Sequence, residues 1–326
     1  MSIPERPQVT GLELAQQFRF GSPGYFLKFE RACAHLQALA DEGGLFVDHF
    51  LHPDGGELVQ DGEWVIIKWG RVIPPPAWWT LYLGDFIHNL RGCLDHLIYQ
   101  LVVANNCDPG AHTAFPICET EGQWKRTIEE RRRQAARPPV TEGVSDVALG
   151  ILKRHQPLRH RTANARQNDP LMHMLHMSNM DKHRTIHVAA VHSGRVQRLR
   201  FVPRGYVRVV ERRVPPAMGL VEAGAELVRM RVEDLQPSPP EVEVGVAYQV
   251  PAKLTFAAPG DTRLVTLDDL FAMLNAVRKI GEDLEVHVGP PGTHFRDLGS
   301  GLAVLNKAMM KAQAGAVPAP PSQPAG

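Results

Sequence analysis

Residues 78–104, WWTLYLGDFIHNLRGCLDHLIYQLVVA, contain the longest amphipathic pattern in the chain. Apolar residues recur there every three or four positions, which is the spacing of one face of an α-helix. This stripe consists of Leu83, Phe86, Ile87, Leu90, Leu94, Leu97 and Leu101. Because so long a stripe needs other helices to cover it, we predict that this helix is the longest and most central of a helical bundle.

The segments before this helix indicate one further helix and a β-hairpin. Ser22-Pro23 is a typical helix start, and apolar residues follow at helical spacing up to Gly43-Gly44, where we expect the helix to end. Residues 45–70 then predict a hairpin, with one arm at 45–47, a turn at 52–56 and the other arm at 64–67.

After the long helix, shorter helices are predicted to begin at Thr120, Ser145 and Pro170. From Thr185 the pattern changes to Val-rich segments of alternating polarity near 185–192, 196–203, 206–214, 225–233, 241–249 and 252–257. Thr266 is expected to cap a closing helix. The predicted fold class is therefore α+β: a helical bundle with a β-hairpin insert, followed by an antiparallel β-sheet and a closing helix.

The same patterns suggest four regions along the chain. We expect a flexible arm over 1–20 and a helical domain over 21–184 that contains the hairpin at 45–70. A β-rich domain with its closing helix follows over 185–288, and 289–326 is expected to be an extended, partly disordered tail because of its composition.

Composition excludes several classes of protein. Of the 326 residues, 44% are hydrophobic and 22% charged, which is typical of a globular chain and not of a disordered or fibrous one. The chain has neither an apolar run long enough for a membrane helix nor a secretory signal, so we expect a cytoplasmic protein without a membrane partner. P-loop and dinucleotide motifs are missing, and no cofactor is predicted.

Metal binding is a competing hypothesis because the chain has 15 histidines. His173/His176 and His183/His187 have ligand-like spacings, with Asp181 nearby. The four cysteines form no C-x-x-C pair and no H-E-x-x-H motif is present, so no metal site is predicted.

The net charge of +1 conceals an uneven distribution. Residues 1–120 carry 7 Lys/Arg and 14 Asp/Glu, residues 121–213 carry 20 and 8, and residues 214–326 carry 9 and 13. The basic middle suggests an anionic partner, and an ordinary solvated surface paired with the acidic regions is the alternative. If RNA binds, we expect the contacts at Arg131, Arg132 and Arg133 and in the loop around Arg159, Arg161 and Arg166.

Two polar clusters are candidate sites. On the long helix, His88, Arg91 and Asp95 share one flank of the apolar stripe, whereas Asn89 and His96 share the other flank. The second cluster lies between the last bundle helix and the sheet, and we predict that it approaches the first, within hydrogen-bond reach of Arg91, Asp95 or His96. It consists of Asn179, Asp181, Lys182, His183 and Arg184. The alternative is an Arg91–Asp95 pair with a purely structural role.

The motif order Asn89-Leu-Arg-Gly-Cys-Leu-Asp-His-Leu97, Phe115-Pro-Ile117, Gln156-Pro157 and Asp181-Lys-His-Arg184 resembles a family of bacterial and phage proteins. More distantly, Arg91-x4-His96 on a helix resembles the signature of HEPN domains, which are helical bundles found in ribonucleases and nucleotide-binding proteins. This resemblance implies RNA or a nucleotide as ligand, no metal, and a homodimer.

For a metal-independent ribonuclease, the resemblance implies catalytic roles for Arg91, Asp95 and His96, with His96 as base or acid and Arg91 on the phosphate. Active members often carry a polar residue after the arginine, whereas this chain has Gly92. The alternative function is a non-catalytic binding or scaffold protein in which Arg91, Asp95 and His96 are structural.

Overall fold

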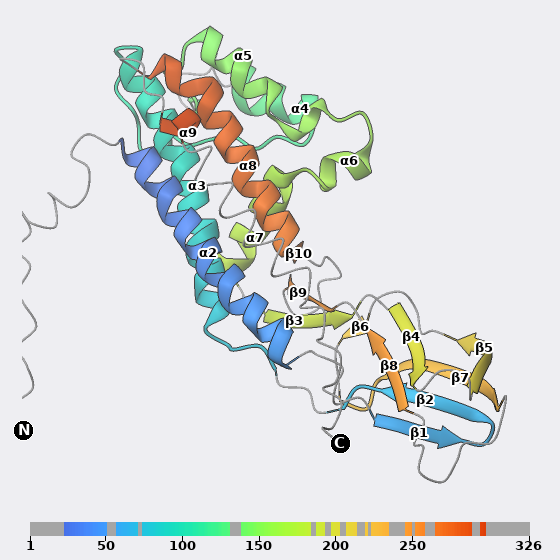
Figure 1. The fold of residues 1–326 in the computed structure, drawn as a ribbon. Helices are drawn as coiled ribbons and strands as arrows, with labels where there is room; N and C mark the ends of the chain where they lie inside the picture. The colour runs from blue at the N-terminus through green and yellow to red at the C-terminus, as the bar shows by residue number, and fades with distance from the viewer. Residues whose placement is uncertain are drawn as a thin grey trace, which may run out of the picture.

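Helices form one end of the molecule and strands gather at the other (Figure 1). The computed structural model describes residues 23–50, 57–70, 74–130, 138–183, 187–192, 197–202, 207–213, 219–220, 223–234, 245–249, 252–257, 265–288 and 294–297. The predicted α+β class is confirmed, with N-terminal helices, a strand hairpin, antiparallel sheets and a closing helix. The predicted arm over 1–20 lies outside the described residues.

The two longest helices, α2 (Gly24–Phe50) and α3 (Trp79–Ala104), form an antiparallel pair. His96 of α3 lies against Gly24 of α2, and Asp85 of α3 lies 3.9 Å from His35 of α2. The two helices therefore run in opposite directions. Helix α3 runs unbroken through Arg91 as predicted, and its apolar stripe is buried against the neighbouring helices. The prediction that it is the longest helix is wrong by one residue, because α2 has 27 residues and α3 has 26.

Glu42 of α2 joins the C-terminal half of that helix to the N-terminal end of α3. Its carboxylate accepts hydrogen bonds from the indole N–H groups of Trp78 (3.3 Å) and Trp79 (2.6 Å) and from the Tyr82 hydroxyl (3.2 Å). No side chain caps the first turn of α3, so a carboxylate at this end also suits the positive end of the helix dipole. These bonds raise the pKa of Tyr82 because its ionised form would face Glu42.

The prediction that Gly43-Gly44 ends the first helix is wrong, because α2 continues to Phe50. Phe46 is buried, with its ring edge-on to Trp79 at 5.4 Å. Burying a phenylalanine contributes about 1.5–3 kcal/mol, which is enough to offset the roughly 2 kcal/mol cost of two helical glycines. The predicted first hairpin arm at 45–47 is therefore helical, and the true arms are β1 (Glu57–Asp61) and β2 (Trp64–Lys68).

The shorter helices begin at the predicted capping residues. Thr120 caps α4 (Glu121–Trp124), which continues as the π-helix η2 (Lys125–Glu129), and Ser145 caps α5 (Asp146–Arg154). The chain then forms the 3₁₀ turn η4 (Pro157–Arg159), α6 (Ala163–Gln167) and α7 (Pro170–His183). Thr266 and Asp269 form a capping box on α8 (Leu267–Leu284), which the 3₁₀ turn η5 (Glu285–His287) follows.

The predicted strands correspond to β3 (His187–His192), β4 (Gln197–Val202), β5 (Val207–Arg213), β7 (Glu226–Asp234), β8 (Gly245–Gln249) and β9 (Ala252–Ala257). Two short strands, β6 (Gly219–Leu220) and β10 (Val265–Thr266), were not predicted. The described strands pair in the orders β1-β2-β7-β5, β10-β9-β3-β6 and β4-β8. The hairpin is thus joined to the C-terminal strands through β7, with Val65 opposite Met230 and Ile67 opposite Val228.

The closing helix α8 packs on the bundle, against α2, α3, α5 and α7. Phe295 in the short helix α9 (His294–Asp297) is fully buried, stacking on Tyr25 at 5.9 Å and meeting Phe29 edge-on. Residues 294–297 therefore do not fit the predicted extended tail, because an aromatic side chain anchors them in the core. Among the described residues, no helix is long and apolar enough to cross a membrane.

Candidate functional site

Arg91 and Asp95 of α3 hold the backbone of Phe115. The Arg91 guanidinium donates to the Phe115 carbonyl at 2.6 Å, while Asp95 Oδ1 accepts from the Phe115 amide at 2.8 Å. The two side chains also pair with each other at 3.3 Å. Phe115 itself is only 1% exposed, so this clamp fixes the Phe115-Pro116-Ile117 segment to the central helix. This geometry fits the alternative that Arg91 and Asp95 form a pair with a purely structural role.

The other candidate residues of α3 do not join this clamp. His96 is exposed and lies against Gly24, where a Cβ would come within 3.0 Å of its Nδ1. Five helical positions separate the two residues, so His96 points about 140° away from Arg91. Asn89 is buried and donates to the Asp85 carbonyl at 2.7 Å, so its amide satisfies its own helix.

Asp181 of the second predicted cluster lies beside α3, but far along the helix from Arg91 and Asp95. Asp181 Oδ1 lies 2.7 Å from the position that a Cβ on Gly84 would take. Gly84 is on the flank that carries Arg91, but two turns earlier, about 10 Å along the axis. Asn179 is exposed. The predicted hydrogen bond to Arg91 or Asp95 is not observed in the described part of the chain, where both residues contact Phe115.

Several predicted site residues lie outside the described residues. They are Arg131, Arg132, Arg133 and Arg184, together with the side chains of Lys182 and His183. In the part of the chain that the structure does describe, no three His, Cys, Asp or Glu side chains are grouped as a metal site requires. His173 lies in the core, 3.9 Å from Asp269.

A region rich in basic residues runs from the end of α5 into α6. Residues 147–168 contain five Lys/Arg and no Asp or Glu. We call Lys153–Arg166, from the end of α5 through η4 into α6, the basic segment. The sequence analysis predicted three of its arginines, Arg159, Arg161 and Arg166, as RNA contacts. It missed Lys153 and Arg154, which the absence of acidic residues over these 22 positions could have identified.

Three arginines of this segment are exposed, Arg154, Arg159 and Arg161. Arg159 lies 3.6 Å from Asp169, whereas Arg154 and Arg161 have no ion-pair partner within the described ranges. Lys153, by contrast, contacts Glu121 and lies 3.4 Å from Glu129. The hydrogen bond to Glu121 is the main cause of the raised pKa of Lys153. Within the described residues, Arg154 and Arg161 are therefore the exposed arginines of this segment that have no carboxylate partner.

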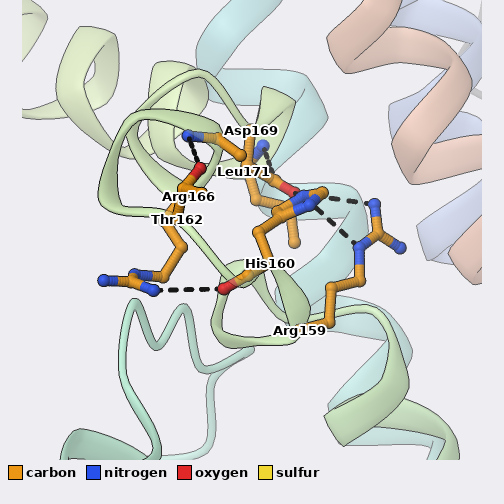
Figure 2. Close-up of polar contacts among 7 residues, drawn as sticks. Arg159, His160, Thr162, Arg166, Asp169 and Leu171 are labelled. Atoms are coloured by element: carbon orange, nitrogen blue, oxygen red, sulfur yellow. Dashed lines mark hydrogen bonds and ion pairs between the residues drawn. The ribbon is translucent and has the colours of Figure 1, made fainter.

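Buried groups hold the loop of the basic segment in shape (Figure 2). The Asp169 side chain, 2% exposed, bonds His160 Nε2 at 2.8 Å and lies 3.6 Å from an Arg159 nitrogen. Arg166 donates to the carbonyls of His160 (3.1 Å) and Arg161 (3.3 Å). These contacts hold the backbone around Arg161.

His155 connects the basic segment to α8. Its Nε2 lies 2.7 Å from Asp283, and the residue is 9% exposed. Burial lowers the pKa of His155, Asp283 raises it, and the positive charges of Arg159 and Lys279 lower it further. The imidazole thus favours its neutral form in the folded protein.

Several arginines of the sheet region are paired with carboxylates. Arg208 of β5 lies 2.5 Å from Glu233 of β7, and Arg213 lies 2.8 Å from Glu211. Arg213 also stacks over the Trp64 ring at 4.5 Å. These two arginines fit the alternative that the basic residues form an ordinary solvated surface with paired charges. Arg154 and Arg161 of the basic segment do not fit it.

No protein-family model, curated protein or solved structure matches this chain. The resemblance to HEPN domains accordingly stays a prediction.

Proposed function

We propose that this protein is a non-catalytic RNA-binding protein that contacts the phosphate backbone of single-stranded RNA through the basic segment. The observation that carries the proposal is the exposure of Arg154 at the end of α5 and of Arg161 on a loop that Arg166 holds, within 22 residues that lack acids. Exposed cations on a backbone that is already held in shape suit the repeating phosphates of RNA, because binding then releases counterions without first ordering the loop.

The contacts of Arg91 favour this proposal over cleavage at the α3 cluster. A metal-independent ribonuclease needs a cation on the phosphate and a base near the attacking hydroxyl. Here Arg91 is bonded to Asp95 and Phe115, while His96 lies on another face of the helix. The ribonuclease hypothesis and the homodimer that would bring two such helices together stay predictions.

Equilibrium titration of fluorescent single-stranded RNA at several salt concentrations tests the binding. The logarithm of affinity should fall with the logarithm of salt by about 0.7 per phosphate contact. The double variant Arg154→Ala/Arg161→Ala should weaken binding and flatten this dependence by up to about 1.4. The matched control is Arg208→Ala/Arg213→Ala, which removes the same charge from ion-paired arginines of the sheet.

Equal losses in the two double variants would show that only total charge matters, and salt-insensitive wild-type binding would contradict the proposal. Incubating the same RNA with the protein in EDTA tests cleavage separately. His96→Ala is the informative variant there, because the side chain is exposed and its removal should leave the fold intact. Sedimentation of the same sample measures the oligomeric state.

A further inference from the structure

We propose that the buried carboxylate of Asp169 holds Arg159 and His160 as a preformed phosphate-binding subsite. The proposal rests on the RNA-binding function above and names the point on that surface where one phosphate group is bound. Its ligand chemistry is a phosphate oxyanion, and the source we infer is the RNA backbone.

The two oxygens of Asp169 have different roles. Oδ1 accepts the Leu171 amide at 2.9 Å and so caps the first turn of α7. An asparagine caps a helix about equally well, so this role does not require a charge. Oδ2 bonds His160 at 2.8 Å and lies 3.6 Å from Arg159.

Burying a carboxylate is costly unless cations offset its charge. With a side-chain exposure of 2%, Asp169 is withdrawn from water, and the Arg159 cation and the hydrogen bond with His160 compensate it. The contacts to these two residues therefore account for an aspartate at a position where capping alone would accept a neutral side chain.

The two partners remain accessible on their outer sides. Arg159 is 47% exposed and His160 is 31% exposed at the side chain. A guanidinium has five N–H groups, and Arg159 directs only its Nε and one terminal nitrogen toward His160 and Asp169. Figure 2 shows the Arg159 guanidinium beside the His160 ring. The remaining N–H groups match the bidentate geometry of a phosphate.

The decisive variant is Asp169→Asn, because two explanations predict opposite signs for its effect. It keeps an oxygen for the α7 cap but removes the charge that orients Arg159 and His160. If Asp169 acted only through its charge, removing a negative group from a basic surface would strengthen RNA binding. If Asp169 positions the subsite, affinity should instead fall about threefold to tenfold, and the salt dependence should flatten by about 0.7 for the lost contact.

Two controls isolate this positioning role. Asp146→Asn removes an exposed acid from the first turn of α5, and we expect it to leave RNA affinity unchanged or slightly raised. In an Arg159→Ala/His160→Ala background, Asp169→Asn should have no further effect, because the residues through which it acts are gone. Thermal unfolding of each variant confirms that it is folded at the assay temperature.

Titrating inorganic phosphate and a 5′-mononucleotide, with NMR detection of the Arg159 and His160 side chains, tests the subsite independently of RNA. We expect phosphate to shift both resonances in the wild type and to shift them less in Asp169→Asn. Folded Asp169→Asn protein that binds RNA and phosphate as tightly as wild type would overturn the inference while leaving the proposed function intact. Wild-type protein that binds phosphate at this loop but shows no affinity for RNA would overturn the proposed function and assign the subsite to free nucleotides.

Discussion

Removing Asp95 should release the Phe115 segment from the central helix. Asp95→Ala deletes the acceptor of the Phe115 amide and the partner of Arg91. A hydrogen bond to a charged group contributes about 1.5–3 kcal/mol. A partly exposed pair at i, i+4 adds roughly 0.3–0.5 kcal/mol. We therefore expect the free energy of unfolding to fall by about 2–3 kcal/mol.

Hydrogen exchange of the Phe115 amide measures this loss locally, and urea unfolding measures it globally. If the segment opens without unfolding the bundle, 2–3 kcal/mol corresponds to exchange that is about 30- to 150-fold faster. Asp95→Asn keeps an oxygen acceptor and should cost only about 1 kcal/mol. Because Arg91 and Asp95 grip the same residue, Arg91→Ala should cost less in the Asp95→Ala background than alone.

This experiment also separates structure from catalysis at the α3 cluster. Asp95→Asn protein that remains folded should bind RNA like the wild type, since the clamp lies outside the basic segment. An unchanged exchange rate at Phe115, with unfolding within about 0.5 kcal/mol of wild type, would refute the clamp as a stabilising element.

Three further perturbations test the packing of the bundle. Glu42→Gln should lower the free energy of unfolding by about 1–3 kcal/mol and shift the tryptophan fluorescence, because a neutral amide replaces the carboxylate that two indoles share. Gly281→Ala should cost about 1–3 kcal/mol in urea unfolding, since the added Cβ would collide with the buried Phe295 ring; an unaltered midpoint would contradict that close contact. Because the folded protein lowers the pKa of His155 from 6.5, the unfolded chain takes up the proton first, so stability should be complete above pH 6.5 and fall below it. His155→Gln should flatten this decline, and an equal decline in both proteins would assign it to groups other than the His155–Asp283 pair.

Short-range patterns in the sequence determined the identity of most elements. Helix α3 follows from a stripe with one period, and its boundaries match the prediction closely. The caps at Thr120, Ser145 and Thr266 were also predictable, because each side chain accepts a hydrogen bond from the backbone amide three positions later. The Val-rich strands follow for the same reason, since alternation is a local signal.

Local sequence patterns gave wrong predictions where packing against a residue distant in the sequence determined the structure. Gly43 and Gly44 favour a helix end, yet the packing of Phe46 on Trp79 carries α2 further. Phe295 lies in a segment of tail-like composition, and only its burial beneath α8 reveals its role in the core.

The candidate sites show the same division between sequence and tertiary structure. The sequence by itself marked Arg91 and Asp95 as polar groups beside an apolar stripe, and it marked the basic charge of residues 121–213. Only the tertiary structure decided that Arg91 and Asp95 hold a peptide 20 to 24 positions away, and that Asp169 is buried against Arg159 and His160. The physical reason is that a buried polar group must be satisfied by whichever partner the fold brings near, and the separation of that partner along the chain has no period that a sequence pattern can display.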